Sequence, residues 1–110
     1  SSQIECALSH NESLLLSCIR SMRYTGGGTN TADAIRTARL LHNGTQANRS
    51  KAIDVITDGA SMSRYATLDQ ASIARSIGII MIGTGVGQYM VESELIGLAS
   101  EPKQDHWTNV

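Results

Sequence analysis

Four stretches of the chain have the hydrophobic pattern of β-strands. Residues 3–8 alternate apolar and polar side chains, which predicts a half-exposed edge strand. Residues 52–57 and 79–82 are short, mostly apolar runs, as expected of strands buried between helices. Residues 106–110 have the pattern of a final strand that is cut short. Asp54 is unusual in its run, and we interpret it as a solvent-reaching or hydrogen-bonded structural carboxylate.

Helical spacing appears between these strands in the first half of the chain. Ser9 and Glu12 have the spacing of a capping box, so we expect a helix that runs to about Arg23. Asn30 or Thr31 can cap a second helix. The apolar face of this second helix consists of Ala34, Ile35, Ala38 and Leu41.

Two further helices are predicted in the second half of the chain. Thr67 and Gln70 form another capping-box pair, and Gly78 suits a left-handed helix end. A last helix covers residues 91–98. Strands and helices therefore alternate along the chain, which predicts a single domain, residues 1–110. Its class is α/β, with a mostly parallel sheet covered by helices on both faces.

Composition narrows the class of protein. The 110 residues are 41% hydrophobic and carry a net charge of -1, as in a globular domain. Because lysines and arginines form no dense patch, we predict no nucleic-acid partner. The sequence has no apolar run long enough for a membrane span. It also begins without a signal-peptide pattern, so a signal for secretion would lie outside this chain.

Cysteines and glycosylation sequons bear on the cellular setting. Cys6 and Cys18 are too few for a disulfide framework and match no zinc spacing, so we interpret them as buried free thiols. A disulfide between them is the alternative. Sequons for N-glycosylation begin at Asn11, Asn43 and Asn48, and they give modest support to an extracellular setting.

Two loops offer oxygen ligands at one edge of the predicted sheet. Thr29 belongs to the glycine-rich loop that opens the second helix, and Asp58 directly follows the strand 52–57. Ligands of parallel α/β sheets gather at the carboxyl ends of the strands, so both residues can face the same edge. A hydroxyl and a carboxylate suit a small divalent cation such as Mg²⁺, which binds few protein groups and keeps several waters.

Four segments carry a resemblance to a known family: RYTGGGTNTADAI, VITDG, GIIMIGTGVG and ELIGLASEP. In this order and with this spacing they are similar to segments of the von Willebrand factor A domain, especially the extracellular matrix members found in collagens and matrilins. The resemblance implies a Rossmann-like sheet with a metal-ion-dependent adhesion site, in which Thr29 and Asp58 ligate Mg²⁺ or Mn²⁺. It also implies a partner-binding rim made of Gly28, Asn30, Thr31, Gly59 and Ser61.

The resemblance departs from the family pattern at the start of the domain. The family's first metal loop, Asp-x-Ser-x-Ser, has no counterpart here, and DGASMS places Ser61 and Ser63 one residue too far from Asp58. The family's first strand, first helix and second strand would precede residue 3. We therefore expect the chain to match the carboxyl-terminal two-thirds of the domain. We also expect it to expose apolar sheet edge and to bind the ion only as part of the complete domain.

Enzymatic alternatives fit the residues poorly. GTGVGQ follows a strand as a dinucleotide fingerprint does, but Gln88 occupies the position of the last glycine. GGGTNT has no Walker lysine, and Ser61 lacks the second glycine of a nucleophile elbow. We predict no catalytic residue and no enzyme activity.

The resemblance implies a secreted module of the extracellular matrix that binds proteins such as collagen or other matrix components. In the family, an acidic side chain of the partner completes the coordination of the ion. The alternative is a structural domain that assembles matrix through sheet or helix surfaces and binds no metal. Glycan on Asn43 or Asn48 would count against an intracellular enzyme.

Overall fold

The computed structural model describes residues 2–24, 26–43 and 49–110. Its three strands form a parallel sheet in the order β1-β2-β3, with Ile53 opposite Met81 and Gly83 opposite Trp107. The α/β class with a parallel sheet is therefore confirmed. In chain order the elements are α1 (Glu12–Arg20), α2 (Thr31–Leu41), β1 (Lys51–Thr57), α3 (Arg64–Ser76), β2 (Ile79–Gly85), α4 (Glu92–Leu98), α5 (Lys103–His106) and β3 (Trp107–Asn109).

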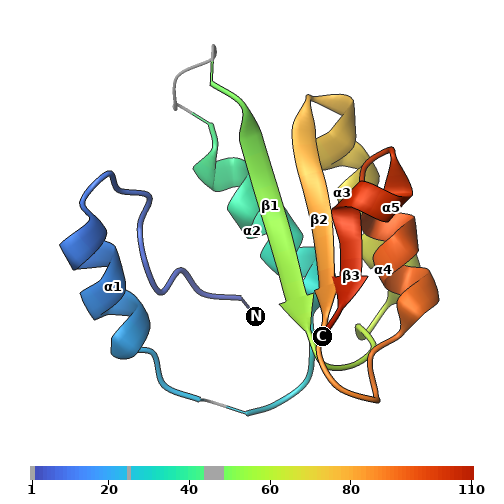
Figure 1. Ribbon diagram of the computed structural model, residues 1–110, viewed down its shortest axis with the longest axis horizontal. Helices are drawn as coiled ribbons and strands as arrows, with labels where there is room; N and C mark the ends of the chain where they lie inside the picture. Colours follow the sequence, from blue (N-terminus) through green and yellow to red (C-terminus); the bar gives the residue numbers. More distant parts are fainter. Residues whose placement is uncertain (1, 25, 44–48) are drawn as a thin grey trace.

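The core lies on one face of the sheet. Ile53 of β1 and Met81 of β2 point to this face, where they join buried side chains from α2, α3 and α4. Figure 1 shows α2 passing behind β1. The buried contributions of the three helices are Ile35 from α2, Ala71 and Ala74 from α3, and Leu95 and Leu98 from α4.

The opposite face of the sheet is exposed within the described residues. Ile56 is 67% exposed and Ile80 is 38% exposed. The prediction that strand 52–57 is buried between helices is therefore wrong for the part of the chain described, because α2, α3 and α4 all pack on the other face. The interpretation of Asp54 is confirmed, since its carboxylate is exposed and accepts a hydrogen bond from the Thr84 hydroxyl at 2.9 Å.

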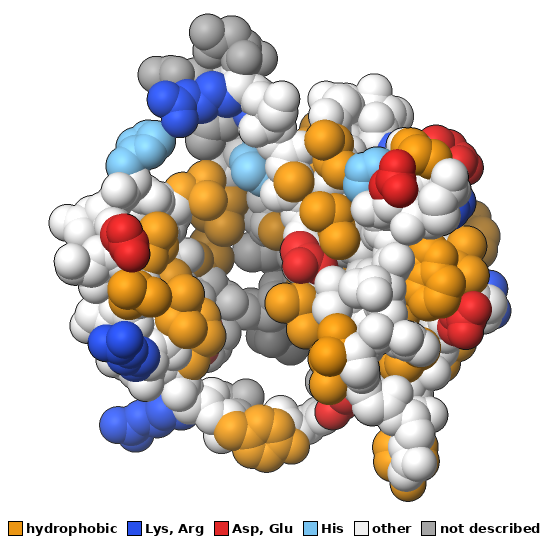
Figure 2. Space-filling view, viewed as in Figure 1, with side chains coloured by type: hydrophobic (Ala, Val, Ile, Leu, Met, Phe, Trp, Pro, Cys, Tyr) orange, Lys and Arg blue, Asp and Glu red, His pale blue; other side chains and the backbone are white. Residues whose placement is uncertain are grey.

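Helix α1 stands apart from the sheet (Figure 1) and has no buried residue. It begins at Glu12 because the side chain of Asn11 accepts a hydrogen bond from the backbone N–H of Leu14 at 3.0 Å. The predicted cap at Ser9 and the predicted end near Arg23 are therefore wrong. Figure 2 shows apolar side chains on both sides of the hollow that separates α1 from the strands.

The N-terminal segment differs most from its prediction. Residues 3–8 form no strand, and a disulfide joins Cys6 to Cys18 with the two Cα atoms 6.0 Å apart. The interpretation of these cysteines as free thiols is wrong, because the chain folds back at the start of α1 and brings the two residues within bridging distance. The segment is tied to α1 by this bond instead of pairing with the sheet.

Two boundaries in the second half also differ from prediction. Helix α3 begins at Arg64, because the Ser63 hydroxyl caps it by accepting a hydrogen bond from the N–H of Ala66 at 3.2 Å. The predicted start at Thr67 is therefore wrong, and Thr67 is fully buried inside the helix. Strand β2 continues to Gly85, three residues beyond the apolar run, because it pairs with β1 along the whole strand.

Glycine is required at the end of β2 by the packing of α4. A Cβ atom on Gly85 would lie 2.6 Å from Cδ1 of Leu95 and 2.9 Å from Cγ of Met90. Leu95 of α4 and Met90, just before that helix, therefore rest directly on the strand backbone. Gly78, just after α3, has a φ of +89°, which confirms the left-handed helix end predicted for it.

Candidate metal site at the carboxyl edge of the sheet

The structure brings Thr29 and Asp58 to one cavity. Strand β1 ends at Thr57, so the exposed Asp58 stands at the carboxyl edge of the sheet, while the half-buried Thr29 lies just before α2. Both residues line a cavity of about 410 Å³, together with Ile56, Thr57 and Val86. Two candidate ligands that are 29 positions apart in the sequence thus share one surface.

The loop that carries Thr29 is shaped by glycine and by the start of α2. Gly26 and Gly27 have φ values of +70° and +98°, a backbone region that residues with a Cβ rarely adopt. Asn30 ends the loop, because its side-chain oxygen accepts a hydrogen bond from the N–H of Asp33 at 3.1 Å. Thr29 therefore lies at the entrance of the helix, directly before its cap.

The loop that carries Asp58 is held at both ends. The Thr57 hydroxyl donates to the carbonyl of Gly59 at 3.2 Å and accepts from the N–H of the same residue at 3.4 Å. The N–H of Val86 donates to the carbonyl of Thr57 at 2.9 Å, and the N–H of Met62 donates to the carbonyl of Thr29 at 2.8 Å. The last bond joins the Asp58 loop directly to the Thr29 loop.

The two side chains fit part of a divalent cation site. Within the described residues, neither the Thr29 hydroxyl nor the Asp58 carboxylate takes part in a hydrogen bond, so both oxygens remain available to an ion. Hard oxygens of this kind are the ligands that Mg²⁺ prefers. No group of three His, Cys, Asp or Glu side chains suited to a metal occurs in the described ranges. The site therefore supplies two oxygens, and an ion there would take its other ligands from water or from another molecule.

The residues of the expected rim occupy unequal positions. Gly28 and Asn30 are exposed beside Thr29, and Gly59 is half-buried beside Asp58. Thr31 is only 7% exposed. The hydroxyl of Ser61 is buried and has no hydrogen-bond partner among the described residues. Gly28 and Asn30 therefore present the most surface, while the Thr31 side chain and the Ser61 hydroxyl lie beneath it.

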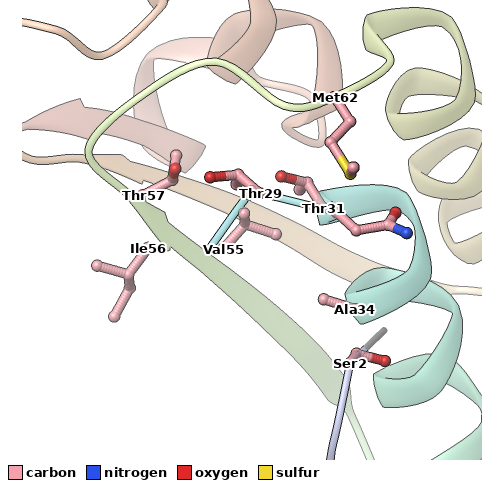
Figure 3. Close-up of a pocket in the computed structure, with 10 residues that line it drawn as sticks. Ser2, Thr29, Thr31, Ala34, Val55, Ile56, Thr57 and Met62 are labelled. Atoms are coloured by element: carbon pink, nitrogen blue, oxygen red, sulfur yellow. The ribbon is translucent and has the colours of Figure 1, made fainter. Parts of the chain in front are cut away.

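A second cavity of about 410 Å³ adjoins the first, since Thr29, Ile56 and Thr57 line both. Figure 3 shows Met62 above this second cavity and Ser2 at its far end. The N–H and the hydroxyl of Ser2 both donate to a carboxylate oxygen of Asp33 at 2.7 Å. The backbone hydrogen bond and then the hydroxyl bond hold the pKa of Asp33 below its ordinary value.

Three residues that shape the site were not predicted from the sequence. Thr57 shapes the start of the Asp58 loop, Met62 joins it to Thr29, and Glu94 accepts a hydrogen bond from the N–H of Ser61 at 3.4 Å. For Glu94 the sequence held a signal of burial, because this acidic residue stands next to the apolar Leu95 in a predicted helix. The other two contacts depend on loop geometry.

The three sequons lie away from this edge or outside the described residues. Asn11 is exposed, and its side-chain oxygen caps α1. Asn43 is exposed just after α2. Asn48 lies outside the described residues. In the ranges that the structure describes, no helix is long and apolar enough to cross a membrane.

A sequence model of the von Willebrand factor type A domain matches residues 1–110. Matrilin-1 from Gallus gallus is 34% identical over 101 residues, which cover 88% of this chain and 20% of the relative. The chain thus spans about a fifth of the length of that curated relative.

Solved structures share the fold. Proximal thread matrix protein 1 from the mussel byssus, in a structure whose MIDAS motif is occupied by zinc, has a TM-score of 0.76 and 22% identity. The match covers 87% of this chain and 25% of that one. The manganese-loaded TRAP protein of Plasmodium vivax has a TM-score of 0.74 and 19% identity over 96% of this chain and 47% of its own. The family model, the matrilin-1 identity and the shared fold agree, and the chain belongs to the von Willebrand factor type A family.

Proposed function

We propose that this chain is a non-enzymatic protein-binding module of the extracellular matrix, and that Thr29 and Asp58 ligate a divalent cation, Mg²⁺ or Mn²⁺. The observation that carries the proposal is the shared cavity at the carboxyl edge of the sheet, which is lined by a hydroxyl and a carboxylate that have no hydrogen-bond partner among the described residues. The similarity to matrix proteins, and to structures that contain zinc or manganese, supports it.

A cation held by two protein oxygens keeps open coordination positions. An acidic side chain of a partner protein can fill one of them, because a carboxylate is both a hard ligand and an opposite charge. Gly28, Asn30 and Gly59 surround the two ligands and would contact such a partner, with Thr31 and Ser61 supporting them from below. We expect the partner to be an extracellular protein such as collagen or another matrix component.

The Cys6–Cys18 disulfide supports secretion, because disulfides persist in oxidising compartments. N-glycosylation at Asn11, Asn43 or Asn48 would be consistent with the same setting. These features and the similarity to matrilin-1 support our proposal that the protein belongs to the extracellular matrix.

Calorimetric titration with MnCl₂ or MgCl₂ tests the metal site. We expect one ion to bind in the complete domain and Asp58→Asn to lose most of the affinity, because the variant removes a charged ligand. Asp54→Asn is the matched control, since it removes an exposed carboxylate from strand β1, which Asp58 follows, but away from the cavity. Equal affinity in all three proteins would rule out the assignment of Asp58.

A second candidate function is a structural, metal-independent matrix domain. The exposed apolar side chains of Ile56 and Ile80 on the sheet face favour it, because such a face can bind another surface without an ion. The two candidates separate in a binding assay with a matrix protein such as collagen. Binding that is abolished by EDTA supports the metal-dependent module, and binding that persists in EDTA supports the structural one.

A further inference from the structure

Glu94 is a buried acid that the proposed metal site does not use. It lies in the first turn of α4 and is 6% exposed, although a buried carboxylate is costly unless it is paired or hydrogen-bonded. Its Oε2 atom accepts a hydrogen bond from the backbone N–H of Ser61 at 3.4 Å. Glu92, on the same turn, is exposed. Of these two glutamates, the buried Glu94 is thus the one that contacts the loop after β1.

Ser61 occupies a central place in that loop. Asp58 stands three residues before it, and Met62, whose N–H is bonded to the carbonyl of Thr29, follows it directly. The Ser61 hydroxyl is itself buried without a hydrogen-bond partner in the described part of the chain. The contact of Ser61 with Glu94 is therefore made by its backbone N–H, at a position between Asp58 and Met62.

We propose that Glu94 is a positioning residue, which fixes the segment from Asp58 to Met62 against the Thr29 loop. The inference rests on the proposed metal function. The carboxylate would not touch the ion. Its hydrogen bond with the Ser61 N–H anchors the loop to α4 between the Thr57 contacts and the Met62 contact. This anchor sets how the two candidate ligands face each other.

Removing the carboxylate tests this role in the absence of metal. In Glu94→Ala, we expect amide hydrogen exchange at Ser61 and Met62 to become about tenfold faster, because the hydrogen bond from the Ser61 N–H to the side chain of Glu94 is lost. Amides of the β1–β2 ladder should keep their rates. Glu94→Gln retains an acceptor oxygen and should restore most of the protection, and Glu92→Ala should behave as wild type. Unchanged rates at Ser61 and Met62 would overturn the proposal, as would a uniform increase across the ladder.

Titration of the same variants with MnCl₂ then separates the two proposals. Outer-shell groups typically change metal affinity by 10–100-fold, so we expect Glu94→Ala to weaken binding about tenfold. If wild type binds Mn²⁺ and Glu94→Ala binds it equally well, Glu94 does not position the ligands. If the complete domain binds no Mn²⁺, the metal function fails, and the exchange rates still decide whether Glu94 fixes the loop.

Discussion

The backbone N–H of Met62 donates to the carbonyl oxygen of Thr29 at 2.8 Å, which joins the loop after β1 to the loop before α2. Met62→Pro removes this donor and should destabilise the domain by about 1 kcal/mol. Met62→Ala keeps the N–H and serves as the control for the loss of the side chain. Urea unfolding of both variants measures the difference. Equal free energies of unfolding would show that the bond between the loops contributes nothing to stability.

The contact of α4 with the backbone of β2 predicts a strict requirement for glycine at position 85. Gly85→Ala places a Cβ atom 2.6 Å from Leu95 Cδ1, so the core must shift, at a cost of roughly 1–3 kcal/mol. Gly59→Ala is the control, because nothing lies within 4 Å of its Cβ position. It should change stability by less than about 0.5 kcal/mol. A Gly85→Ala protein as stable as wild type would contradict the described packing.

The disulfide predicts a local effect of reduction. Helix α1 has no buried residue, so the bond between Cys6 and Cys18 is a principal constraint on its position. In the Cys6→Ser, Cys18→Ser double variant, amides of α1 should exchange much faster while those of the β1–β2 ladder keep their wild-type rates. Hydrogen exchange followed by NMR makes the comparison. Equal loss of protection in α1 and in the ladder would mean that the disulfide supports the whole domain.

Asp33 predicts a dependence of stability on pH. Its pKa is lowered in the folded state by the N–H and the hydroxyl of Ser2, from an ordinary value of 3.8. The unfolded chain therefore binds more protons between the two pKa values. The stabilisation is present above pH 3.8 and is lost as pH falls through the folded pKa. In Asp33→Asn, the free energy of unfolding, measured in urea, should fall less as pH decreases below 3.8. An unchanged fall would exclude the contact of Asp33 with Ser2 as its source.

The spacing of apolar residues along the chain predicted much of the fold. The apolar spacing of α2 and the run that begins β2 led to elements at the right places, because their side chains face one core. The alternation of residues 3–8 wrongly predicted an edge strand, since the pattern does not show whether a neighbouring strand is available for pairing. Loop contacts decided the rest. Ser63 caps α3 in place of Thr67, and the disulfide depends on a reversal of the chain that residue spacing does not encode.

The candidate site was predictable to a similar extent. Thr29 and Asp58 each follow a recognisable local pattern, and the topology of a parallel sheet brings them to one edge. The position of Glu94 beside Leu95 was a signal in the sequence, but its contact with Ser61 was not predictable, because that contact depends on the distance from α4 to a loop more than thirty residues earlier in the chain.

The most direct test of the metal site is the broadening of backbone amide NMR signals by Mn²⁺, which affects nuclei close to the ion. We expect selective broadening at Thr29, Asp58 and Gly59 in the complete domain and its loss in Asp58→Asn. Broadening that is centred elsewhere, or that persists unchanged in Asp58→Asn, would contradict a cation site formed by Thr29 and Asp58.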